Sequence, residues 1–96
     1  MNKLAERIKD DLMKEIDEFK DELMTEVEMN VRETGSCIVS LFCEKFESGW
    51  ESASMSHVRV PKRYAFYVEN EYTFQGFKVD KIYTPAGNLC KFRIHL

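Results

Sequence analysis

Three cysteines and two histidines are the residues that could in principle supply the ligands of a zinc site: Cys37, Cys43, Cys90, His57 and His95. Structural zinc sites usually take their ligands in pairs two to four residues apart, and the sequence contains no Cys-x-x-Cys. Cys90 and His95 are close in sequence, but alternation along a strand would put them on opposite faces. We therefore expect reduced, mostly buried thiols and neither a metal nor another cofactor.

Catalysis would need a nucleophile beside a base, and Cys43 with His57 could form such a pair. Any small protein with this many cysteines and histidines permits such a pairing. The sequence has no Gly-x-Ser-x-Gly elbow, no phosphate-binding glycine loop and no His-Glu-x-x-His. A chain of 96 residues also has a thin core, which leaves little room for an active-site cleft. We expect a protein that is not an enzyme.

Carboxylates are concentrated at the N-terminal end: residues 1–34 carry eleven Asp and Glu against six Lys and Arg, whereas residues 35–96 carry six against eight. On a helix, one acidic stripe places like charges one turn apart, which costs a little stability. The stripe consists of Asp11, Glu15, Glu18, Glu22 and Glu26. Two interpretations stay open. The stripe is either a solvated face or a contact for a partner protein with a basic surface, on which carboxylates imitate a row of phosphates.

The C-terminal half carries the opposite charge, and its cations are interleaved with tyrosines. A basic sheet with aromatic side chains can follow a nucleic-acid backbone and stack bases. The candidate contacts are Arg59, Lys62, Arg63, Lys91 and Arg93. However, a small positive balance is ordinary for a solvated sheet, and the strand motif of RNA-recognition domains is missing. Direct nucleic-acid binding is therefore the alternative function rather than the leading one.

A long N-terminal helix, predicted over residues 1–34, positions the acidic stripe. No Gly or Pro occurs before Gly35, and apolar residues recur every three or four positions. Such a helix would be about 45 Å long, and Gly35 suits a left-handed cap at its end. Its apolar face is longer than a small sheet can cover, so we predict a homodimer. The self-association seam would be Leu12, Ile16, Phe19 and Leu23.

Residues 35–56 are predicted to hold a short helix over 36–48 and then a serine-rich loop. The helix would place Ile38, Leu41 and Phe46 on one face, whereas a strand, which stays open as an alternative, would group Cys37 with Val39.

Residues 57–96 are rich in Val, Ile, Tyr, Phe and Thr, which favours strands. We predict an antiparallel meander of strands over 57–69, 72–84 and 89–95, with turns at 70–71 and 85–88. An alternative makes 61–75 a helix, with Pro61 in its first turn and Gly76 beyond its end.

These elements predict a single domain over residues 1–96 with an α+β fold: a long N-terminal amphipathic helix, a short second helix and a small antiparallel sheet at the C-terminus. No stretch approaches the ~18 apolar residues of a membrane span. The first residues run into a charged helix rather than an apolar signal segment. We therefore expect a cytoplasmic protein with no membrane partner.

Residues 71–79, Glu-Tyr-Thr-Phe-Gln-Gly-Phe-Lys-Val, followed by Ile82 and Tyr83, resemble C-terminal stretches of some phage-encoded anti-CRISPR proteins, which inhibit bacterial CRISPR–Cas nucleases. The chain is also similar to them in being short, acidic and without recognised motifs. These inhibitors share a way of working more than a sequence, so the resemblance carries over no functional residue. It implies an inhibitor that binds a host protein with a basic nucleic-acid channel, such as a Cas nuclease, in the cytoplasm of a bacterial host.

Overall fold

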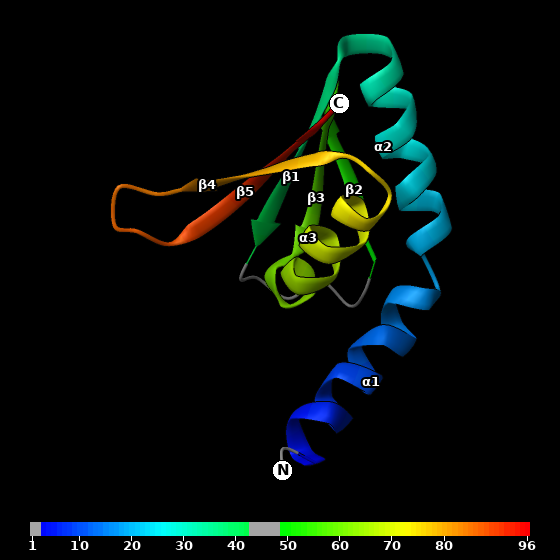
Figure 1. Cartoon of the computed structure of the whole chain (residues 1–96), viewed down its shortest axis with the longest axis vertical. Helices are drawn as coiled ribbons and strands as arrows, with labels where there is room; N and C mark the ends of the chain where they lie inside the picture. The colour runs from blue at the N-terminus through cyan, green and yellow to red at the C-terminus, as the bar shows by residue number, and fades with distance from the viewer. Residues whose placement is uncertain (1–2, 43–48) are drawn as a thin grey trace.

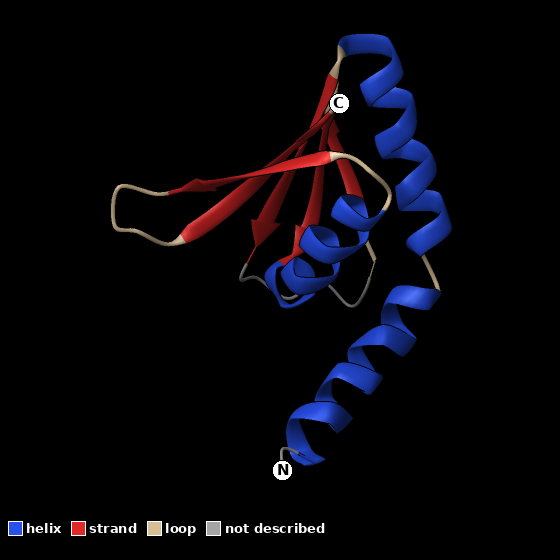
Figure 2. Cartoon of the chain, in the orientation of Figure 1, coloured by secondary structure: helices blue, strands red, loops and turns tan. Residues whose placement is uncertain are grey.

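The computed structural model describes residues 3–42 and 49–96 and has an α+β fold (Figure 1, Figure 2). The elements in chain order are α1 Lys3–Asp17, α2 Lys20–Thr34, β1 Ser36–Phe42, β2 Glu51–Ser54, β3 His57–Pro61, the 3₁₀ turn η1 Lys62–Tyr64, α3 Ala65–Phe74, β4 Lys78–Tyr83 and β5 Leu89–His95. The predicted α+β class is confirmed. The strands, however, are interspersed through the chain after Gly35 and are not confined to its C-terminal part.

The five strands form one mixed sheet in the order β2-β3-β1-β5-β4. The central strand β1 pairs in parallel with β3 and antiparallel with β5. The edge strands β2 and β4 pair antiparallel with β3 and β5. The purely antiparallel meander that we predicted is therefore wrong. A parallel pair needs a long connection that returns the chain to the same end of the sheet, and the connection from β1 to β3 contains β2.

The described helices pack on one face of the sheet, so the molecule has two layers (Figure 1). Alternate residues of the three inner strands point into the core between the layers: Cys37, Val39, Leu41, Val58, Val60, Phe92 and Ile94. The helical layer contributes Ile16, Phe19, Leu23, Val27, Val31, Tyr64, Tyr67, Val68 and Tyr72. The opposite face of the sheet carries no helix from the described part of the chain.

The single helix predicted over 1–34 is broken into two at Glu18 and Phe19. At this point the backbone tightens, since the amides of Glu18 and Phe19 donate to the carbonyls three residues earlier, Glu15 at 3.3 Å and Ile16 at 3.0 Å. The break lets Ile16 and Phe19 both enter the core, while the N-terminal turns of α1 extend away from the sheet (Figure 1). No Gly or Pro marks the site, so no local pattern in the sequence indicates the break.

The short helix predicted over 36–48 is wrong as far as Phe42, because these residues form β1; residues 43–48 lie outside the described part. The strand alternative is correct. Because β1 is the central strand, its residues are buried or half-buried on both faces. Apolar residues on both faces blur the period-two pattern and allow a helical interpretation.

Within the predicted meander, the segment after Pro61 is helical, and only 78–83 and 89–95 are strands. The alternative is confirmed: η1 and α3 follow Pro61, and Gly76, at φ 95°, lies beyond the end of α3. The predicted turn at 70–71 is wrong, since both residues lie in α3. Aromatic and β-branched residues favour strands intrinsically, but Tyr64, Val68 and Tyr72 recur every four residues and pack one helical face into the core.

Two local predictions are confirmed. Gly35 caps α2 in the left-handed conformation, at φ 90°, and its amide donates to the carbonyl of Val31. The turn at 85–88 is closed by hydrogen bonds between Thr84 and both Gly87 and Asn88. As for membrane spans, no helix among the described residues is long and apolar enough to cross a bilayer.

Candidate binding surfaces

The face of the sheet opposite the helices, termed the open sheet face, carries a cluster of cations. The strand register places Ser40 at its centre, with Arg59 of β3 on one side and Lys91 of β5 on the other. In the next row, Ile38 lies between His57 and Arg93. Lys91 and Arg93 are exposed and form no ion pair with side chains in the described part of the chain.

Arg59 is held in place by two neighbours on the same face. Its guanidinium pairs with Glu51 of β2 at 3.2 Å and lies over the ring of Phe42, 3.7 Å from the ring centre. A cation so placed over an aromatic ring is attracted by the ring's electron-rich face. The guanidinium is therefore held against the sheet surface rather than free to rotate in solvent.

Ser40 and His57 are hydrogen-bonded to each other, Oγ to Nε2, between these cations. Ser40 is 5% exposed, although it lies on the face without helices. Burial lowers the pKa of His57 below its ordinary value, and the positive charges of Lys91 and Arg59 lower it further. At neutral pH, His57 is therefore a neutral hydrogen-bonding group in a cationic surrounding.

Of the five residues predicted as nucleic-acid contacts, the structure brings three together on the open sheet face: Arg59, Lys91 and Arg93. Lys62 and Arg63 lie instead in η1. His57 and Ser40 were not among the predicted contacts. Residue spacing within each strand could have placed His57 beside Arg59, but Ser40 joins them through the parallel pairing of β1 and β3, which we did not predict.

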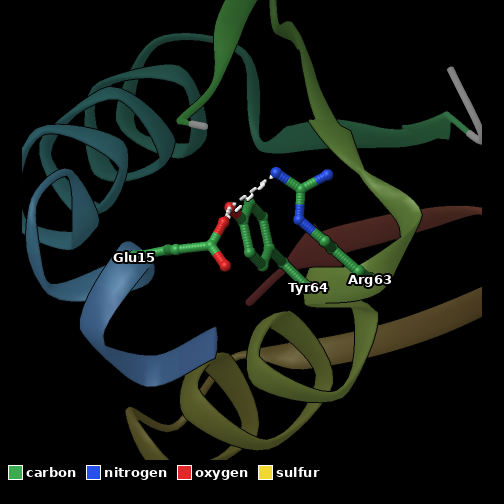
Figure 3. Close-up of polar contacts among 3 residues, drawn as sticks. All are labelled: Glu15, Arg63 and Tyr64. Carbon is green, nitrogen blue, oxygen red and sulfur yellow. Dashed lines mark hydrogen bonds and ion pairs between the residues drawn. The ribbon is translucent and has the colours of Figure 1, made fainter. Parts of the chain in front are cut away.

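Arg63 takes part in a second polar cluster, with Glu15 of α1 and the core residue Tyr64 (Figure 3). The Tyr64 hydroxyl donates to Glu15 Oε1 at 2.6 Å, and Arg63 donates to the same oxygen at 3.2 Å. The hydrogen bond from Tyr64, followed by that from Arg63, lowers the pKa of Glu15. Burial and this bond raise the pKa of Tyr64 to about 12. The cluster fastens the end of α1 to the rest of the fold.

The predicted acidic stripe is therefore not one straight row on the structure. Glu15 is engaged within the protein, and the helix break at Glu18 separates Asp11 and Glu15 on α1 from Glu22 and Glu26 on α2. Asp11, Glu18 and Glu22 are exposed, and Glu26 is half-buried. None of these four pairs with a cation in the described part of the chain.

The predicted self-association seam lies largely inside the protein itself. Ile16, Phe19 and Leu23 belong to its own core, at 0%, 7% and 1% exposure, and Leu12 is half-buried against that core. The large exposed apolar residues of α1 are instead Leu4 and Ile8, at 69% and 51%. The seam residues are therefore occupied by contacts within one chain.

The cysteines and histidines among the described residues do not gather at one place. Cys37 is buried in the core, and burial raises the pKa of its thiol; Cys90 is half-buried. His57 and His95 lie on the open sheet face, and His95 pairs with Asp80 at 2.8 Å. Cys43 lies outside the described residues. Within those that are described, no three Cys, His, Asp or Glu side chains are arranged to hold a metal ion.

The chain thus presents a basic sheet face on one side and acidic helices on the other, and each is a surface on which a charged partner could bind. Comparison with protein-family models, with curated proteins and with solved structures finds no match.

Proposed function

We propose that this protein is a non-enzymatic binding protein whose open sheet face holds a single nucleic-acid strand. The observation that carries the proposal is the row Arg59–Ser40–Lys91 with Arg93 beside it, spread over three adjacent strands. Adjacent strands are about 4.8 Å apart, so the backbones of the two cationic residues in this row are roughly 10 Å apart. Such a row can contact successive phosphates of one strand.

Stacking would complement the phosphate contacts. Proteins that bind single strands place bases on aromatic rings or on guanidinium planes. The guanidinium of Arg59 already lies over the ring of Phe42 and is held there by its ion pair with Glu51. A base stacked on this platform would meet a preorganised surface, which reduces the entropy lost on binding.

The test is a fluorescence-anisotropy titration of labelled oligo-dT and oligo-U at several salt concentrations. Replacing Lys91 and Arg93 with Gln should weaken binding by about tenfold or more and make the salt dependence shallower, by about 0.7 in logarithmic slope for each phosphate that the variant no longer neutralises. Lys62→Gln is the matched control, because Lys62 is exposed but lies in η1, away from this face. Its affinity should stay within about twofold of the wild type.

Two results would overturn this function. One is an absence of oligonucleotide binding by the folded wild-type chain at low salt. The other is that Lys91→Gln, made alone so that it removes one charge as the control does, weakens binding no more than Lys62→Gln, which would mean that net charge alone attracts the strand.

The second candidate function is the one that the sequence resemblance implies, inhibition of a host nucleic-acid-handling protein such as a Cas nuclease. The observation that favours it is the exposure of Glu18 and Glu22, which no described cation neutralises. We propose that such a partner would bind the acidic helices through its basic channel. Glu18→Gln with Glu22→Gln should then weaken the partner's inhibition several-fold in a DNA-binding competition assay, more so at low salt. Undiminished inhibition by this variant would exclude the acidic helices as the contact.

A further inference from the structure

A groove runs between the α1–α2 junction and α3, on the helical side of the molecule. Two adjoining hollows of about 300 and 360 Å³ form it, and both are lined by Met13, Tyr67 and Glu71. We call this surface the helix groove; its other apolar lining residues are Met24, Phe66 and Phe74. It lies on the layer opposite the open sheet face and is independent of the nucleic-acid function proposed above.

The apolar lining of the helix groove is only partly used by the fold. Met13, Met24 and Phe66 pack against the core but stay half-exposed, and Phe74 at the end of α3 is 83% exposed. Methionine side chains adapt their shape to varied apolar partners, and exposed aromatics are common anchors of protein interfaces. The groove therefore offers an apolar floor that an amphipathic segment could cover.

The rim of the helix groove is acidic. Lys20 and Asp21 line one hollow together with Glu71, and Lys20 is itself paired with Asp17 at 3.0 Å. The carboxylates of Asp17, Asp21 and Glu71 therefore all lie near the ammonium group of Lys20. Asp17 chiefly, with smaller contributions from Asp21 and Glu71, raises the pKa of Lys20. Burial chiefly, and then the same three carboxylates, raises the pKa of the neighbouring Tyr67 hydroxyl to about 12. The rim therefore carries more negative than positive charge.

We propose that the helix groove is a docking site for a basic amphipathic segment of a partner protein, which places an apolar side chain between Met13 and Phe74 and a Lys or Arg beside Asp21 and Glu71. Charge complementarity selects this occupant. An apolar floor alone would accept any hydrophobic helix, but the excess of carboxylates at the rim repels acidic segments and attracts cationic ones.

The experiment uses the full chain with ¹³C-labelled methionine methyl groups and two synthetic peptides. The peptides share the same amphipathic leucine pattern and carry either Lys or Glu at every polar position. We expect the Lys peptide to shift the methyl resonances of Met13 and Met24 and to bind at least about tenfold more tightly than the Glu peptide. Met29 and Met55, which are 49% and 85% exposed and line neither hollow, serve as internal controls and should not shift.

Two matched pairs of variants test the contacts. Phe74→Ser should weaken the Lys peptide several-fold, whereas Met55→Ser, at a residue exposed to a similar degree, should not. Glu71→Gln should weaken it, whereas Glu33→Gln, on the exposed end of α2, should not. The proposal is overturned if the Met13 and Met24 methyls do not respond, if the two peptides bind equally, or if the members of either pair behave alike. Oligonucleotide binding is measured on the same variants, so that failure of the docking proposal is distinct from failure of the sheet-face function.

Discussion

At the scale of single residues, the contact of Glu15 with Tyr64 and Arg63 shows how a carboxylate in an acidic row becomes part of the fold. Tyr64 is 1% exposed, and its hydroxyl has its hydrogen-bond partner in Glu15. We predict that Glu15→Gln lowers the free energy of unfolding at neutral pH by about 1 kcal/mol, the ordinary value of such a bond after allowance for solvent screening. Urea unfolding measures it.

The matched control for this variant is Glu18→Gln, three residues along and exposed, which should stay within about 0.5 kcal/mol of the wild type. The pH dependence follows from the lowered pKa of Glu15. Stabilisation by this carboxylate is complete above its unfolded pKa, near 4.3, and is lost as pH falls through the folded value below it. The difference between wild type and Glu15→Gln should therefore shrink in acid, and a constant difference would contradict this mechanism.

His57 supplies the second prediction at this scale. Burial, Lys91 and Arg59 lower its folded pKa, so the unfolded chain binds the proton more readily. Stability from this group is fully present above the unfolded pKa and is lost as pH falls through the folded pKa. The free energy of unfolding should decline between about pH 7.5 and pH 5, and we expect His57→Gln to make this decline shallower. The control is His95→Gln, which replaces the histidine that pairs with Asp80 and should keep the contribution of His57 to the decline. An unchanged slope in His57→Gln would show that neither burial nor the two cations lowers the pKa of this ring.

From the sequence alone we could predict some of the cations on the open sheet face, but none of the side-chain contacts described above. Arg59, Lys91 and Arg93 could be chosen from the sequence because their charge is a property of each residue. The bond from Tyr64 to Glu15 joins residues 49 positions apart. Such pairs depend on how the elements pack, and no local pattern in the sequence encodes them.

At the scale of elements, α1 has an inner end next to the helix break, which packs into the core, and an outer end, which is exposed. The chain offers two isoleucines for a matched comparison, Ile16 at 0% and Ile8 at 51% exposure. We predict that Ile16→Ala lowers the free energy of unfolding by about 2–4 kcal/mol, because it leaves a cavity in the core, and that Ile8→Ala changes it by less than about 1 kcal/mol. Urea unfolding of the two variants side by side measures the difference.

The same pair of variants tests the predicted homodimer. If the seam through Ile16 joined two chains, the effect of Ile16→Ala on the midpoint would depend on protein concentration. We expect an effect that is independent of concentration, since Ile16 is buried within one chain. Sedimentation of wild type and Ile8→Ala tests whether the exposed outer end of α1 associates instead.

The ends of helices and the positions of turns could be predicted where the conformational preference of a single residue determines them. Gly35 ends α2, Pro61 precedes a helical segment, and the turn after Thr84 joins two strands. The break at Phe19 was not predictable in this way. It accompanies the burial of both Ile16 and Phe19 in the core, which depends on how the helices pack on the sheet. The parallel register of β1 and β3 likewise results from packing.

At the scale of the whole molecule, the helices and the sheet share one core, and Cys37 lies in it. The rate at which its thiol reacts therefore measures how often the core opens. This thiol is buried, and its raised pKa keeps it protonated at neutral pH. We predict that Cys37 reacts with an alkylating reagent at least about a hundredfold more slowly than Cys90, because its exposure requires opening of the core. Mass spectrometry of the quenched reaction resolves the two sites.

Denaturant is the control for this measurement: above the unfolding midpoint the two cysteines should react at similar rates. A Cys37 that reacts quickly in the folded protein would mean that the sheet opens independently of the helices. Reductant should leave the melting temperature unchanged, since we expect the thiols to be reduced already.

The position of β5 in the sheet has a consequence for how the chain acquires its structure during synthesis. β5 is made after every other described element, yet it lies between β1 and β4 and pairs with both. While it is missing, the central strand has one open edge, and the helices have no complete sheet to cover. A nascent chain that ends before Leu89 therefore holds exposed backbone and apolar surface, the state that chaperones and proteases recognise. Completion of this sheet must therefore wait until β5 has emerged from the ribosome.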